Sequence, residues 1–260
     1  MSNEPFFTRV GDLYQPNPIS RGPWDPKSLH GRVVIGLLGY EIERLYGGED
    51  FIPARLTVDM YRLPDLSAAS VTTRVVRDGH RIKVIDAEYI VNGVSMGRAT
   101  CQLLRRTENP AGNVWSPPGW DAPLPEALPV PEPSRNPLGG MWAMRPITGG
   151  FGEVGRKRTW MSEVRELVGG EPLTLFSRVA LAADFASPFA NSGDQGLAYI
   201  NTDVTVYLHR LPRDPWIGFE VVDHQATDGV AVGECRLHDR EGPIGSAMVA
   251  ALAQKRGMRS

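Results

Sequence analysis

The sequence Leu-Thr-Val-Asp-Met-Tyr-Arg-Leu-Pro at residues 56–64 returns as Val-Thr-Val-Tyr-Leu-His-Arg-Leu-Pro at residues 204–212, an offset of 148 positions (204 minus 56). Both copies alternate apolar and polar residues, the two-residue period of a strand with one buried face. Each copy ends in a proline, which ends a strand because it has no N–H to donate to the next one. The pair predicts an equivalent strand in each of two repeated units.

The same offset relates the segments that follow. Residues 81–89 align with residues 229–237, and residues 97–99 align with residues 245–247, the last pair being reached through a glycine turn in each copy. Order and spacing therefore match over about 50 residues, which indicates a duplicated domain and not a solenoid of short repeats.

One helix is predicted ahead of each set of strands. Residues 28–46 have apolar side chains at helical spacing and stop at two glycines, and residues 172–185 are rich in Ala and Leu and stop near a Ser-Pro pair. The first of these helices is apolar nearly all round at its start, as expected of a helix enclosed by other structure. We therefore predict an α+β fold, a double hotdog of two tandem units, each a long antiparallel sheet wrapped around a central helix.

A proline-rich stretch separates the two units. Nine prolines between positions 110 and 137 exclude a regular helix or a central strand there. The predicted organisation is an N-terminal hotdog unit over residues 1–106, a crossover linker over 107–156 and a C-terminal hotdog unit over 157–260. The last unit is expected to open with a strand over residues 157–168.

Composition narrows the function classes. The 260 residues are 42% hydrophobic and carry a net charge of −2, which offers no positive field for nucleic acid. Residues 1–15 contain no apolar segment typical of a signal peptide, and no run of about 18 apolar residues predicts a membrane span. Cys101 and Cys235 stand alone in strand-like runs, as buried thiols of a reducing compartment do, so we expect a cytoplasmic protein. Phosphate-binding loops and metal-ligand spacings are missing from the sequence, so we predict no metal and no cofactor.

Several motifs resemble a known family. Tyr-Ile-Asn-Thr-Asp-Val-Thr-Val-Tyr-Leu-His-Arg at residues 199–210, with Trp-Ile-Gly at 216–218 and Asp-Gly at 228–229, is similar to the second half of the acyl-CoA thioesterase II-like proteins of the double-hotdog thioesterase superfamily. His30-Gly31 at the start of the first predicted helix resembles that family's N-terminal unit. The resemblance covers roughly residues 20–106 and 160–255, with the proline-rich stretch outside it.

The resemblance implies a function in lipid metabolism, the hydrolysis of acyl-CoA thioesters to free acid and CoA. In that family an aspartate, a hydroxyl residue and a glutamine orient and activate water, without a metal or a covalent intermediate. The implied partner is an acyl-CoA or acyl-carrier thioester, with no nucleic acid and no membrane span. A homo-oligomer is a further expectation, because the edges of hotdog sheets often pair between subunits.

Carried over residue by residue, the resemblance places the catalytic group in the second unit. The aspartate falls on Asp203 and would act as the general base toward water. The hydroxyl position falls on His224 by direct count, with Thr227 as the nearest threonine, so His224, Gln225 or Thr227 would assist.

The glutamine of the family has no direct equivalent in the second unit. Its position falls on Ala250, whereas the repeat places Gln102 at the corresponding position of the first unit. Gln102 is therefore the candidate that would supply the missing amide by meeting Asp203 across the duplication. Strand alternation argues against a buried Asp203, because it shares a face with the polar residues of its strand.

The start of the first predicted helix is the expected binding point for the thioester oxygen. Backbone N–H groups at a helix N-terminus match the oxyanion that forms during attack on a carbonyl. We therefore assign substrate binding to His30, Gly31 and Arg32.

Three other functions stay open. A non-catalytic acyl-CoA or lipid-binding double-hotdog protein with a degenerate site would explain Ala250, and a hotdog hydratase or dehydratase would act on enoyl thioesters. Gly93-Val94-Ser95-Met96-Gly97 matches the GxSxG pattern of serine hydrolases. That pattern needs a strand, a sharp turn and a helix, whereas here it lies at a predicted hairpin.

Overall fold

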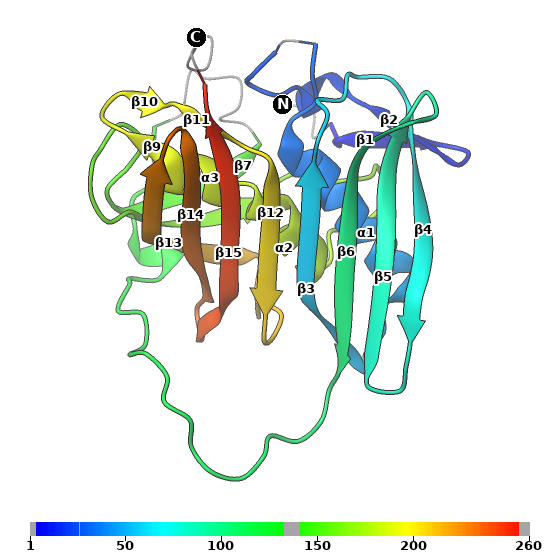
Figure 1. The fold of residues 1–260 in the computed structure, drawn as a ribbon. Helices are drawn as coiled ribbons and strands as arrows, with labels where there is room; N and C mark the ends of the chain where they lie inside the picture. The colour runs from blue at the N-terminus through cyan, green and yellow to red at the C-terminus, as the bar shows by residue number, and fades with distance from the viewer. Residues whose placement is uncertain (1–3, 26, 133–140, 255–260) are drawn as a thin grey trace.

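The two halves of the chain contain the same order of elements (Figure 1), and the computed structural model describes residues 4–25, 27–132 and 141–254. The first half consists of β1 (Phe7–Val10), β2 (Leu13–Pro16), the 3₁₀ turn η1 (Pro18–Ser20), α1 (Gly31–Tyr46), β3 (Phe51–Met60), β4 (Ala69–Asp78), β5 (Ile82–Val91) and β6 (Val94–Arg105). The second half consists of the 3₁₀ turn η2 (Pro125–Ala127), β7 (Trp142–Thr148), β8 (Arg158–Glu163), α2 (Leu175–Ala183), α3 (Ala186–Asn191), β9 (Ser192–Gly193), β10 (Gly196–Leu197), β11 (Tyr199–Asn201), β12 (Asp203–Leu208), β13 (Trp216–Thr227), β14 (Val230–Asp239) and β15 (Gly242–Ala253). Two strands, a helix and four further strands thus occur twice in the same sequence order, and the second half adds α3 and the short strands β9, β10 and β11 after its helix.

One sheet runs through both halves. Within the described residues it contains 13 strands in the order β1-β2-β4-β5-β6-β3-β12-β15-β14-β13-β8-β7, with β11 added alongside β15. The second half of this order is the first half read from the other end, strand for strand. The predicted double hotdog is confirmed, since each half wraps a long antiparallel sheet around its own helix (Figure 1).

The halves meet at the strands that carry the sequence repeat. β3 and β12 pair antiparallel, with Thr57 opposite Thr205. These two threonines are equivalent residues of the repeat, and the Thr205 hydroxyl donates to the Thr57 hydroxyl at 3.2 Å. An approximate twofold axis therefore passes between them and relates the two units.

The helices pack against each other behind the sheet (Figure 1). Their contact is close because α1 has glycines at the crossing: a Cβ on Gly36 would lie 2.6 Å from Leu181, and a Cβ on Gly39 would lie 2.8 Å from the Cβ of Ala180. Both predicted helices are present, the second as α2, but the Ser-Pro pair expected to end it lies inside a further short helix, α3. Pro188 lies in the first turn of α3, where a missing N–H leaves no helical hydrogen bond unmade. No helix within the described ranges is long and apolar enough to cross a membrane.

The predicted linker is only partly irregular. Its C-terminal part forms β7, which pairs with β8 at one end of the sheet and tolerates Pro146 because an edge strand needs fewer ladder donors. Upstream, Trp120 is stacked on His238 with ring centroids 4.2 Å apart, and a Cβ on Gly218 would lie 2.3 Å from its ring. The crossover segment is therefore fastened to the second half at Trp120.

Candidate active site

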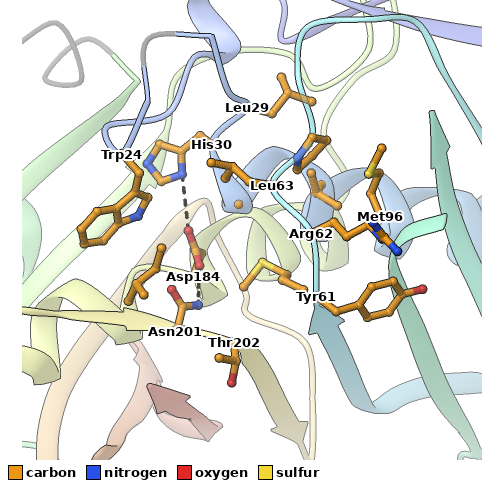
Figure 2. A pocket seen from close by; sticks show the side chains of 15 residues that line it. Trp24, Leu29, His30, Tyr61, Arg62, Leu63, Met96, Asp184, Asn201 and Thr202 are labelled. Carbon is orange, nitrogen blue, oxygen red and sulfur yellow. Dashed lines mark hydrogen bonds and ion pairs between the residues drawn. The ribbon is translucent and has the colours of Figure 1, made fainter. Parts of the chain in front are cut away.

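A cavity of about 230 Å³ lies beside the start of α1, at the boundary of the two halves (Figure 2). Its lining is mostly apolar, and three of its polar side chains, His30, Asp184 and Asn201, lie together at one side. The first half contributes Trp24, Leu29, His30, Gly31, Val34, Met60, Tyr61, Arg62, Leu63, Pro64 and Met96, and the second half contributes Asp184, Ile200, Asn201 and Thr202. A concave apolar site with a few convergent polar groups is typical of a small-molecule pocket.

Asp184 is the only acidic residue among those lining residues, and it occupies the break between α2 and α3. Its side chain is only 9% exposed. The carboxylate lies against the first residue of α1, because a Cβ added at Gly31 would be 3.3 Å from Asp184 Oδ2. Glycine at that position is what lets a carboxylate from the second half approach a helix N-terminus of the first.

Two side chains hold the Asp184 carboxylate (Figure 2). Asn201 Nδ2 donates to Oδ1 at 2.9 Å, and His30 Nδ1 lies 3.4 Å from Oδ2. The same His30 nitrogen is 3.4 Å from the backbone N of Arg32. It can accept from that N–H only when it is unprotonated and can donate to the carboxylate only when it carries the proton. His30 therefore links the carboxylate to the helix start through a single nitrogen whose role depends on its proton.

The surroundings keep Asp184 ionised. Burial favours the neutral acid, but the hydrogen bond and charge of His30, the hydrogen bond from Asn201 and the charge of Arg32 together hold the pKa of Asp184 below its ordinary value. An ionised carboxylate next to water in this cavity can accept a proton, as a general base must.

Arg32 lies behind the cavity wall and not in the cavity. Its guanidinium is buried, forms an ion pair with Glu163 of β8 and lies 4.5 Å from the centre of the Trp142 ring. This ion pair joins the first turn of α1 to the sheet of the second half. Removal of either partner would leave a charge buried without its counterion, which is strongly unfavourable.

A family model of the acyl-CoA thioesterase C-terminal domain matches residues 119–252. The chain belongs to the acyl-CoA thioesterase family. Thioester hydrolysis is the general activity of that family. A search of curated proteins finds no matching relative.

Solved structures support the same fold for this thioesterase-family chain. It resembles a hotdog-fold protein of unknown function from Alicyclobacillus acidocaldarius, with a TM-score of 0.76, 14% identity and 96% of each chain covered. It also resembles the tesB protein of Mycobacterium avium subs paratuberculosis, with a TM-score of 0.69, 14% identity and coverage of 95% of this chain and 96% of that one. The acyl-CoA thioesterase II TesB2 of Mycobacterium marinum gives a TM-score of 0.65 at 13% identity, with 96% of each chain covered. At these identities the likeness shows the shared architecture alone.

Asp203 lies outside the cavity of this thioesterase-family chain. It is half-buried on the outer face of the sheet, where its Oδ1 accepts the backbone N–H of Ala250 at 2.7 Å. Burial and the charge of neighbouring Asp59 raise its pKa, against the effect of the Ala250 hydrogen bond. The physical reason for its position is strand alternation: Val204 and Val206 occupy the buried face, so Asp203 faces the other way. The expected general base is therefore not among the groups that the cavity brings together.

The residues expected to assist Asp203 are also elsewhere. His224 is exposed on β13, and its Nδ1 lies 3.0 Å from Asn191 Oδ1. Gln225 is exposed and donates to Asp223, and Thr227 ends the same strand in solvent. None of the three belongs to the described lining of the cavity.

Gln102 cannot complete a site with Asp203. Asp203 is opposite Asp59 on β3, whereas Gln102 is opposite Arg55 on the same strand. Four residues of a strand separate these two positions by about 13 Å. By contrast, His30 and Gly31, expected from the start of the first helix, do line the cavity.

Asp184 and Asn201 are among the polar cavity residues that the sequence analysis missed, together with Tyr61, Arg62 and Thr202. One signal was available for Asp184, since it is the single charged residue in the apolar stretch 179–190. A carboxylate is almost never fully buried without a partner, so its presence in an apolar helix is informative. The partner itself could not be found in this way, because His30 lies more than 150 positions earlier in the sequence.

Proposed function

We propose that this chain hydrolyses acyl-CoA thioesters to the free acid and CoA, with Asp184 as the general base. The observation that carries the proposal is the buried carboxylate of Asp184, held by His30 and Asn201 next to the N-terminus of α1 inside an apolar cavity. Asp184 thereby takes the role that the resemblance assigned to Asp203.

The reaction needs a place for the thioester oxygen. The first turn of α1 presents backbone N–H donors, among them that of Arg32 facing His30 Nδ1, and the positive end of the helix dipole, and Gly31 brings that turn to the cavity wall. A thioester oxygen bound there gains stabilisation as it becomes an oxyanion. Such preorganised donors contribute more in the transition state than in the ground state, which is what accelerates the reaction.

Asp184 supplies the base. As the oxygen of a water molecule attacks the carbonyl carbon, one of its protons passes to the carboxylate and a tetrahedral oxyanion forms. When the intermediate collapses, the carbon–sulfur bond breaks and the proton passes from Asp184 to the departing thiolate. The products are the acid and the thiol, and Asp184 returns to its ionised form without having bonded covalently to the acyl group.

Asn201 provides the amide that is missing at Ala250. Its Nδ2 donates to Asp184 Oδ1 and, at 3.3 Å, to the backbone oxygen of Asp203. This fixes one carboxylate oxygen and leaves the other for His30 or water. In our proposal, an asparagine from β11 thus performs the orienting task that the family assigns to a glutamine.

The decisive experiment measures thiol release. The purified protein is incubated with acyl-CoAs of several chain lengths, and free CoA is followed by its reaction with a thiol reagent. Turnover would support hydrolysis, whereas saturable binding without CoA release would overturn it in favour of the non-catalytic ligand-binding alternative. Loss of enoyl absorbance from an unsaturated acyl-CoA without CoA release would instead indicate a hydratase.

A further inference from the structure

The repeat places the tripeptide Arg-Leu-Pro at the end of β3 and again at the end of β12, and the second copy has a clear structural task. Arg210 makes two hydrogen bonds to the carboxylate of Asp239, at 2.5 and 2.7 Å. Asp239 is buried and also accepts the backbone N–H groups of Arg213 and Glu241, each at 2.9 Å. Arg210 is thus the cationic partner of a carboxylate that organises a turn.

The first copy has lost that task. The residue of the first copy that is equivalent to Asp239 is Val91 (239 minus 148), which is buried and apolar. Within the described residues no carboxylate forms an ion pair with Arg62, whose side chain is exposed. The backbone N–H of Arg62 still donates to Met96 at 3.1 Å, so the segment is held while the guanidinium is free.

The free guanidinium lies at the cavity (Figure 2). Arg62 is the one lysine or arginine among the described lining residues, and Asp184 is the one acid. Asp184 is buried and Arg62 is exposed, so the two charges mark the inner and outer ends of the pocket. Apolar side chains, among them Met60 and Leu63, line the space they share.

We propose that Arg62 binds a phosphate group of the thioester's carrier. This rests on the proposed function, because it takes the occupant of the cavity to be an acyl thioester. CoA and the prosthetic arm of an acyl carrier protein share a pantetheine phosphate, and CoA has further phosphates on its nucleotide. An arginine without an internal partner binds phosphate through two parallel N–H donors, and it is the group that an anion reaches first at the outer end of the cavity.

The test compares thioesters that differ only in phosphate. Acyl-CoA, acyl-phosphopantetheine and acyl-pantetheine with the same acyl chain are supplied to the wild type, Arg62→Ala and Arg62→Lys. The control is Arg77→Ala, an exposed arginine on β4 that is not part of the cavity lining. Arg62→Ala should raise KM for acyl-CoA about tenfold with little change in kcat, and Arg62→Lys should raise it less. KM for acyl-pantetheine should stay the same in all variants, and Arg77→Ala should behave as the wild type.

The acyl-phosphopantetheine arm identifies which phosphate is bound. A penalty with this substrate as well as with acyl-CoA assigns Arg62 to the phosphate shared by both carriers, and a penalty with acyl-CoA alone assigns it to the nucleotide phosphates. Unchanged KM for acyl-CoA, or an equal rise with acyl-pantetheine, would overturn the proposal.

Two measurements distinguish a failure of the phosphate site from a failure of the proposed hydrolysis. Turnover of acyl-pantetheine by the wild type tests hydrolysis of a substrate that has no phosphate. A failure to hydrolyse it would contradict the proposed function but would not test the phosphate site at Arg62. In that case, weaker binding of CoA to Arg62→Ala than to the wild type, measured by calorimetry, still decides whether the anion site exists. Thermal unfolding controls for folding: Arg210→Ala should lower the melting temperature and Arg62→Ala should not.

Discussion

Replacement of Asp184 by asparagine removes the proposed base while keeping the shape of the side chain. The new carbonyl oxygen can still accept from Asn201 Nδ2, which is 2.9 Å from Oδ1 in the native chain, so the cavity wall should remain in place. A positioned general base contributes about 10²- to 10⁴-fold to a rate. Asp184→Asn should therefore lower kcat for acyl-CoA hydrolysis by that factor, equivalent to about 3–5 kcal/mol in the activation free energy.

The matched comparison is Asp203→Asn, which makes the same chemical change on the outer face of the sheet. Its carbonyl oxygen can keep the 2.7 Å hydrogen bond from Ala250, so turnover should stay within about twofold of the wild type. Thiol release at saturating acyl-CoA and circular dichroism of all three proteins provide the measurement. If Asp203→Asn were inactive and Asp184→Asn active, with both folded, the assignment of the base would be refuted.

Further predictions concern pH, packing and substrate. The pH profile of kcat/KM should be level through neutral pH, because the lowered pKa of Asp184 keeps the base ionised there; an acidic limb above about pH 5 would contradict this. Burial lowers the pKa of His238 to about 4, against the pull of Glu220. The unfolded chain binds this proton near pH 6.5, so the free energy of unfolding in urea should fall by about 2 kcal/mol from pH 7 to pH 5, and by less in His238→Gln. Gly39→Ala should destabilise the fold by about 1–3 kcal/mol in thermal unfolding, because its Cβ would lie 2.8 Å from the Cβ of Ala180, which cannot rotate away. Because the cavity has a volume of only about 230 Å³, hexanoyl-CoA should be hydrolysed faster than palmitoyl-CoA, and equal rates would show another route for the acyl chain.

The repeat and the helix predicted ahead of each set of strands were together sufficient to predict the architecture. The offset of the repeat predicted equivalent strands, and the structure pairs those strands with Thr57 opposite Thr205. Strand β7 was missed because it lies in a stretch dominated by prolines, and one of them, Pro146, is inside the strand itself. Proline excludes a central strand but is tolerated in an edge strand, so its presence led residues 142–148 to be assigned to the linker although they form a strand.

The candidate site was predicted only in part. His30 and Gly31 were expected at a helix start, a local feature that can be identified in the sequence, and both line the cavity. Asp184 was overlooked because an apolar helix was interpreted as core. Asp203 was selected because its neighbours in sequence resembled a motif, but alternation along β12 directs its carboxylate to the outer face. What joins Asp184 to His30 is the packing of one helix end against another, and no short-range pattern encodes a contact between residues so far apart in the chain.

The presence of both units in one chain, joined at β3 and β12, also affects how activity depends on protein concentration. In a site built by two separate chains, the proposed base and the helix N-terminus would separate whenever the chains dissociated, and activity would fall as the protein concentration decreased. Here the crossover segment holds the two units in one molecule, and covalent connection of this kind typically supplies an effective concentration on the order of millimolar. His30 from one unit and Asp184 from the other therefore stay together at any cellular abundance, so activity per molecule is expected to be independent of how much of the protein is present.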